Sequence, residues 1–162
     1  MSILTVDVWR ASDDRSGAEL RAAAGLPVDQ VGEVTVSSGE ACYMNVTNTR
    51  GCSLLVAATV RIGVDVEPVR ARPLVTRLAR RCMTDAEHAD WRRANDPDRA
   101  FLAHWTRVEA YLKAIGVGVR GGLLTRPPAG WSLIDLPLGA DHVGALAVES
   151  LLPIALCFHE LN

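Results

Sequence analysis

The chain has 162 residues, 49% of them hydrophobic, which is enough for one domain with a sizeable core. A formal charge of −2 and the lack of a zinc-finger or RNA-binding signature argue against a nucleic-acid partner. No apolar run reaches the length of a membrane span, and the acidic pair Asp13 and Asp14 stands where a signal peptide would be apolar. We therefore expect a cytoplasmic protein with no membrane partner.

The cysteines have no spacing that is typical of a metal site, and no CxxC pair occurs. They are Cys42, Cys52, Cys82 and Cys157. Without a neighbouring cluster of histidines or cysteines, they are expected to be small buried hydrophobic residues in a reducing compartment.

The hydrophobic pattern predicts strands first and helices later. The expected order is a strand at residues 3–9, a helix from Ser12 or Asp13 to about residue 24, strands at 31–36 and 42–47 joined by a turn at 37–39, strands at 53–60 and 62–66, helices at 73–81, at 85–93 and from about residue 98, and strands at 131–136, 143–148 and 154–159. This order favours an α+β fold. We expect a single domain of two sheet-bearing halves, residues 1–61 and 62–162.

The long helix carries the first chemical feature. Apolar residues recur at helical spacing and predict one buried stripe, made of Phe101, Trp105, Val108, Leu112 and Ile115. Glu109 and Lys113 are four residues apart, so their side chains can converge. Lys113 is the only lysine of the chain, which otherwise uses arginine. A compact ammonium beside a carboxylate indicates a functional site on this helix.

The second feature is the segment Gly-Val-Asp-Val-Glu at residues 63–67. On a strand, Asp65 and Glu67 project to the same face, where two carboxylates repel unless they are solvated, protonated or bridged by a cation. Oxygen ligands of this kind suit Mg²⁺, and Glu109 could supply a third carboxylate. The alternative is an exposed strand end with two solvated acids.

These two features together resemble the signature of the 4′-phosphopantetheinyl transferase superfamily. GVDVE, about forty residues and then WTRVEAYLKAIGVG follow the family pattern (V/I)G(V/I)D(V/I)E, WxxKExxxK and a GxG turn. The segment Asn-Val-Thr-Asn-Thr at residues 45–49 is similar to the NxSHS segment of these enzymes. The resemblance implies a diverged, shortened member nearer the surfactin-synthetase-activating type, with two small pseudo-symmetric sheet-plus-helix halves and the site between them.

Enzymes of this family move the phosphopantetheine arm of coenzyme A to a serine of an acyl or peptidyl carrier protein, as a holo-[acyl-carrier-protein] synthase does. The resemblance implies that Asp65, Glu67 and Glu109 hold Mg²⁺ and that Lys113 contacts phosphate. Thr47 and Asn48 would face the nucleotide end of coenzyme A. The base for the serine is either Glu109 or a metal-bound water. Arginines between residues 70 and 81 would suit an acidic carrier protein.

Three departures weaken the expected contacts to coenzyme A. Val108 replaces the lysine of the family pattern, Asn48 replaces its histidine, and the segment between Arg21 and Asn48 has no basic residue. Three hypotheses therefore stay open: an ordinary Mg²⁺-dependent transferase, a repurposed member doing acid/base chemistry on a natural-product intermediate (cyclisation, dehydration or isomerisation), and a non-catalytic binder of carrier proteins. Phe101 and Trp105 are expected in the core, and neither His104 nor His142 is given a role. The sequence does not define the oligomeric state.

Overall fold

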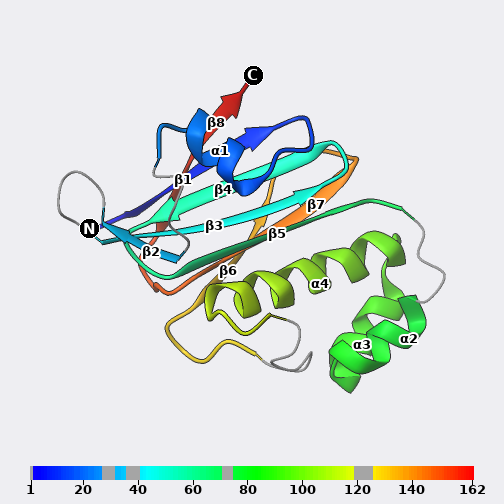
Figure 1. The fold of residues 1–162 in the computed structure, drawn as a ribbon. Coiled ribbons are helices and arrows are strands. Elements are labelled where there is room, and N and C mark those ends of the chain that lie inside the picture. Colours follow the sequence, from blue (N-terminus) through cyan, green and yellow to red (C-terminus); the bar gives the residue numbers. More distant parts are fainter. Residues whose placement is uncertain (1, 27–31, 36–40, 71–74, 119–125) are drawn as a thin grey trace.

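The structure is a computed structural model that describes residues 2–26, 32–35, 41–70, 75–118 and 126–162. Within these ranges it contains four helices and eight strands in two sheets, which confirms the predicted α+β class (Figure 1). The turn predicted at residues 37–39 and the start of the helix predicted at residue 73 lie outside the described residues. No described helix is both long and apolar enough to cross a membrane.

The larger sheet has five strands, in the order β2-β3-β4-β1-β8. They are β1 (Leu4–Ala11), β2 (Gly32–Thr35), β3 (Ala41–Thr49), β4 (Cys52–Ala58) and β8 (Ile154–Leu161). The last strand of the chain runs parallel to the first, with Leu4 opposite Ile154, and the other pairs are antiparallel. The first and the last strand of the chain thus lie side by side in the same sheet. The division into residues 1–61 and 62–162 stays a proposal.

The smaller sheet is antiparallel and has the order β5-β7-β6, with β5 (Ile62–Pro68), β6 (Ser132–Leu136) and β7 (His142–Val148). The largest apolar cluster joins the two sheets. Its buried residues come from β1, β4, β5, β6 and β7 and from the segment after β6: Val6, Val8, Cys52, Leu54, Val56, Ala58, Ile62, Val64, Val66, Leu136, Leu138, Leu146 and Val148. The core therefore fixes how the sheets meet.

Helix α1 (Gly17–Ala23) covers the outer face of the larger sheet (Figure 1). Its buried Leu20 packs with Met44 and Leu55. The helix begins later than the predicted Ser12 or Asp13, because Ser16 is the N-cap and forms a capping box with Glu19. The preceding residues instead form a connection that hydrogen-bonds to the neighbouring strands.

Three helices follow β5: α2 (Val75–Cys82), α3 (Asp85–Arg93) and α4 (Pro97–Ala114). The predicted capping box of Thr84 and Glu87 is confirmed at the start of α3. Helix α4 begins after the N-cap Asp96, and Gly116 ends it with a φ of 74°. Figure 1 shows α4 lying along the smaller sheet, with α2 and α3 near its N-terminal end.

Gly63 allows α4 to lie directly on β5. A Cβ atom at this position would stand 2.0 Å from the carbonyl oxygen of Ala110 and 2.6 Å from the backbone nitrogen of Ala114. Because both atoms belong to the helix backbone, no side-chain rotation can relieve the contact. The glycine that precedes Asp65 by two residues is thus what brings the helix that carries Glu109 and Lys113 against this strand.

The aromatic core was predicted correctly, but the cysteines only in part. Phe101 is fully buried and stacks with Trp105 at a centroid separation of 6.1 Å. Cys52 and Cys82 are buried, and Cys42 is half-buried. The expectation was wrong for Cys157, which is exposed because β8 lies at the edge of the larger sheet.

Candidate active site

A hydrogen-bond network around Asp65 joins the two sheets to α4. The side chain of Asp65, on β5, is 9% exposed, and its Oδ1 lies 2.7 Å from the Nζ of Lys113. The ammonium also donates to the hydroxyl of Thr47, on β3, at 3.1 Å and to the carbonyl oxygen of Val64 at 3.3 Å. The Thr47 hydroxyl in turn donates to Asp65 Oδ1 at 3.3 Å. Predicted residues from three distant parts of the chain thus meet at one point.

Burial and neighbouring charges raise the proton affinity of Asp65 and Glu109. Burial raises the pKa of Asp65, and neighbouring Glu67 adds to this effect, while Lys113 and Thr47 lower the pKa only in part. Burial also raises the pKa of Glu109, and the charges of Asp65 and Glu67 act in the same direction, against Lys113. The three predicted acids therefore share one electrostatic environment that favours an added cation.

The acids fit a divalent cation in chemistry but do not form a ready-made cage. Asp65 Oδ2 is buried and has no hydrogen-bond partner among the described residues, so this hard oxygen can accept a cation. Within the described part of the chain, however, no three His, Cys, Asp or Glu side chains are grouped closely enough to hold a metal ion. Without a cation, three carboxylates repel, and Lys113 partly compensates the charge of Asp65. The ligand role of Asp65, Glu67 and Glu109 stays a prediction.

Asn48 has a role in the structure that sequence analysis missed. Its side-chain amide donates to the carbonyl oxygen of Arg15 at 3.1 Å. Arg15, Gly17 and Asn48 line a small pocket together with Thr47, beside the network of Asp65 and Lys113. Arg15 was missed because it lies 33 residues from Asn48 and belongs to no motif. The structure therefore places a basic side chain where the sequence showed none.

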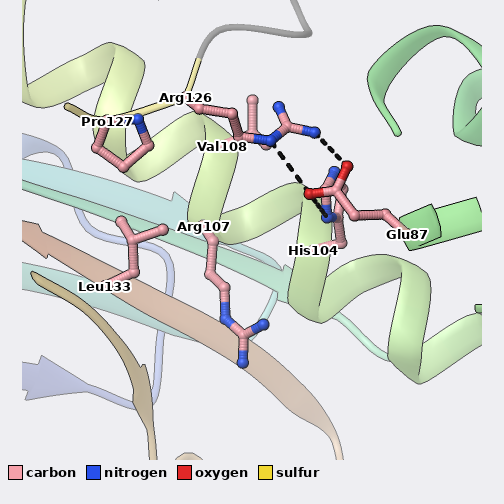
Figure 2. Close-up of a pocket in the computed structure, with 7 residues that line it drawn as sticks. All are labelled: Glu87, His104, Arg107, Val108, Arg126, Pro127 and Leu133. Atoms are coloured by element: carbon pink, nitrogen blue, oxygen red, sulfur yellow. Dashed lines mark hydrogen bonds and ion pairs between the residues drawn. The ribbon is translucent and has the colours of Figure 1, made fainter. Parts of the chain in front are cut away.

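A second pocket, of about 420 Å³ including its open mouth, flanks Val108 (Figure 2). Its lining comes from α3, α4, β6 and the segment before β6: Glu87, His104, Arg107, Val108, Arg126, Pro127 and Leu133. Val108 is buried and gives this pocket an apolar wall at the position of the family's lysine. Arg107 does not replace that lysine, since its Nε donates to Asp135 Oδ1 on β6 at 2.7 Å.

Glu87 is the centre of the charged side of this pocket. Its carboxylate accepts from Arg126 through Nε, at 3.1 Å, and through Nη2, and His104 lies beside it at 3.9 Å (Figure 2). Arg126 and His104 both also contact the backbone oxygen of Cys82, at 2.9 Å each. These contacts connect the segment before β6 to the C-terminal end of α2 and to the first turn of α3.

Replacing Glu87 with glutamine should remove part of the acid sensitivity of the fold. Partial burial raises the pKa of Glu87, but hydrogen bonds from Arg126 and Thr84 outweigh burial and lower it to about 2 from 4.5. The folded-state pKa is depressed, so the stabilisation is present above about pH 4.5 and is lost as the pH falls towards 2. Glutamine keeps the capping box without the charge. Urea unfolding should show that the stability advantage of wild type over Glu87→Gln falls progressively from about pH 5 down to about pH 2.

The matched control is Glu149→Gln, because Glu149 forms a long, exposed ion pair with Arg61, at 3.7 Å. The free energy of unfolding of Glu149→Gln should differ little from that of wild type throughout the same pH range. A Glu87→Gln difference that stays constant with pH would contradict the stabilising role of the Arg126 contact.

Two comparisons relate this chain to known proteins. The model of the 4′-phosphopantetheinyl transferase superfamily matches residues 61–158, which include β5, α4 and both predicted motifs. The fatty acid synthase subunit alpha of Penicillium patulum is 28% identical over 143 residues, which are 87% of this chain and 7% of that relative. The chain thus corresponds to a small part of the relative's length. Because the family match covers more than half of the chain, the protein belongs to the 4′-phosphopantetheinyl transferase superfamily.

Proposed function

We propose that this protein transfers 4′-phosphopantetheine from coenzyme A to a serine of an acyl or peptidyl carrier protein in a Mg²⁺-dependent reaction, as a cytoplasmic enzyme. The observation that supports this most is the network in which Lys113 and Thr47 contact Asp65 where the two sheets and α4 meet. A lysine beside a group of electrostatically coupled acids can bind both the phosphates of coenzyme A and a cation. The family supplies the general type of reaction.

The reaction exchanges one phosphorus–oxygen bond for another. The serine oxygen of the carrier protein attacks the phosphorus next to the pantetheine arm, and the bond from that phosphorus to the bridging oxygen breaks. The leaving group is 3′,5′-ADP, which takes the bonding electron pair. Lys113 contacts a phosphate oxygen and offsets the negative charge that develops there. The Lys113 ammonium is held in position by Thr47 and Val64, so little reorganisation is needed.

Asp65 and Glu67 would hold the cation, and Glu109 would either complete the ligand set or accept the serine proton. When bound, Mg²⁺ neutralises phosphate charge as a Lewis acid. Burial and the neighbouring acids raise the pKa of Glu109, which makes its carboxylate a stronger base. The two roles for Glu109 differ in their metal dependence, which allows them to be separated by experiment.

The carrier protein would bind to the basic surface formed by the arginines of α2 together with Arg70. Arg77, Arg80 and Arg81 of α2 are exposed, as is Arg70. Similarity to a fatty acid synthase subunit favours an acyl carrier among the possible partners. Electrostatic attraction of an acidic carrier would mainly increase the rate of encounter.

The first test is the intact mass of apo acyl and peptidyl carrier proteins after incubation with the enzyme, coenzyme A and Mg²⁺. The expected result is a mass gain of one phosphopantetheine arm, lost with EDTA and reduced at least about 100-fold in Asp65→Asn and Glu109→Gln. If Glu109 is a metal ligand, excess Mg²⁺ should partly rescue Glu109→Gln; if it is the base, metal should not help and the pH profile should change.

The competing functions predict other outcomes. No mass gain across several carriers, with no calorimetric binding of coenzyme A, would exclude the transferase. A pure carrier binder would then bind carriers regardless of Glu109. A repurposed acid/base enzyme would lose its activity in Glu109→Gln without any need for coenzyme A.

A further inference from the structure

The last strand of the chain, β8, is an edge strand with an accessible outer side. It pairs with β1 in eight consecutive residue pairs without a bulge, and no described strand pairs with its other side (Figure 1). None of its eight residues is buried, and the large apolar side chain of Phe158 is exposed. A regular, exposed edge of this length can bind a further strand through backbone hydrogen bonds.

This edge lacks most of the features by which sheet edges avoid pairing with one another. Residues 150–158 include no charged side chain, and their proline, Pro153, precedes the strand rather than interrupting it. By contrast, β6, an edge of the smaller sheet, carries exposed Asp135, which pairs with Arg107. The opposite edge of that sheet, β5, carries the acids of the candidate site. Of these three edges, only β8 is uncharged over most of its length.

A hydrogen bond at the start of β8 shows which backbone groups are available for pairing. The N–H of Leu4 donates to the carbonyl oxygen of Pro153 at 2.9 Å. Because backbone groups alternate in direction along a strand, those of the odd-numbered residues of β8 point to β1. The groups that point to the free edge belong to Ile154, Leu156, Phe158 and Glu160. An added strand must therefore hydrogen-bond to the even-numbered residues.

The sequence of β8 complements itself in one antiparallel register. With Cys157 opposite Cys157 of a second copy, the even-numbered residues lie opposite one another, as their free backbone groups require. Phe158 of each copy then faces Leu156 of the other, which gives two equivalent aromatic–aliphatic contacts. The two Glu160 carboxylates lie at opposite ends of the paired strands, about 20 Å apart, so that salt screens their repulsion.

We propose that β8 is a dimerisation edge, which pairs antiparallel with β8 of a second copy of this chain and has its two-fold axis at Cys157. The contact joins the two larger sheets and uses the same edge of both copies, so assembly through it stops at the dimer. Since it consists mainly of one pair of short strands, the expected dissociation constant is on the order of 10 µM. The network of Lys113 and Asp65 lies within one chain, so this inference does not rest on the proposed function.

The first test is sedimentation velocity of the purified protein from about 1 to 300 µM, a range that brackets the expected constant. Wild type should change from monomer to dimer as the concentration rises, and it should form no larger species. Phe158→Lys places a charge on the apolar contact, and Cys157→Lys places two like charges opposite each other. Each variant should weaken the dimer at least about tenfold. Both side chains are exposed, so both variants should unfold near the wild-type temperature in dilute solution.

The matched control is Leu133→Lys. Leu133 lies on the edge strand β6 and is 38% exposed, against 39% for Phe158. The control thus adds the same charge at an equally exposed apolar position on a different sheet edge. It should dimerise as wild type does.

The register is tested by disulfide formation under mild oxidation. In the proposed pairing the two Cys157 Cα atoms are about 4.5 Å apart, which a disulfide can span. Wild type should therefore form a linked dimer on a non-reducing gel. In a Cys157→Ser background, Ala155→Cys presents an exposed thiol on the same face, but about 14 Å from its counterpart in the other copy. This variant should dimerise without becoming linked.

Three outcomes would overturn the inference. If wild type stays monomeric up to about 300 µM, the edge is empty or serves a different partner. If Phe158→Lys and Cys157→Lys dimerise like wild type, another surface forms the dimer. If Ala155→Cys becomes linked as readily as wild type, the strands pair in another register. None of these results bears on the transferase reaction, which the mass assay tests separately.

Discussion

Gly63→Ala is expected to be the most destabilising glycine-to-alanine change among the residues that the structure describes. The new methyl group would stand 2.0 Å from the Ala110 carbonyl oxygen, so α4 must move away from β5. Overpacking a core typically lowers the free energy of unfolding by about 1–3 kcal/mol. Because this clash is with backbone atoms, we expect a loss of about 3 kcal/mol or more. For a chain of this size, that corresponds to a fall in the melting temperature of about 10 °C. Differential scanning calorimetry would measure it.

The matched control is Gly139→Ala. Gly139 has a φ of 86°, but its Cβ would meet no atom within 4 Å, so alanine there brings backbone strain of about 1–2 kcal/mol without a clash. Equal losses at the two positions would contradict the prediction, because they would show that the contact with α4 costs no more than backbone strain. Because α4 carries Lys113, Gly63→Ala should also reduce transfer in any fraction that stays folded.

Lys113→Met should lose both stability and activity, and a second change should restore only the stability. Removing the ammonium leaves the Asp65 carboxylate uncompensated at 9% side-chain exposure. Breaking a buried pair costs about 3–5 kcal/mol, and because Lys113 is 28% exposed we expect about 2 kcal/mol. In the double variant with Asp65→Asn, the buried charge is gone, so most of that loss should be recovered.

Transfer should stay at least about 100-fold below wild type in both the single and the double variant, because neither offers a cation to the phosphate. Urea unfolding of the four proteins of the cycle gives the coupling energy, and the mass assay gives the activity. Additive stability effects would mean that Lys113 and Asp65 are not coupled. Recovery of transfer in the double variant would show that Lys113 serves only to hold the fold.

Local patterns were enough to predict most of the secondary structure. The strand β5, the capping box of Thr84 and Glu87, and the helix α4 were predicted from neighbours within a few residues, and each is present in the structure. The alternation read in β5 does not appear as alternating burial, since its first five residues are all buried. The start of α1 was wrong, because Ser12, Asp13 and Ser16 are all plausible caps by residue type and only the contacts with β4 select the last one. The buried stripe predicted for α4 was too narrow, since Thr106, Ala110 and Tyr111 are also buried.

The sequence by itself determined the family and the residues proposed to carry its chemistry, because Asp65, Glu67, Glu109 and Lys113 lie in two short motifs, each defined by local spacing. Only the tertiary structure decided what these residues contact. Lys113 contacts Asp65 on β5, a partner 48 residues away, because Gly63 lets the helix approach the strand. Arg15 lies beside Thr47 because hydrogen bonds between backbone and side chains fix the connection after β1. Contacts over such separations depend on packing, which no local spacing encodes.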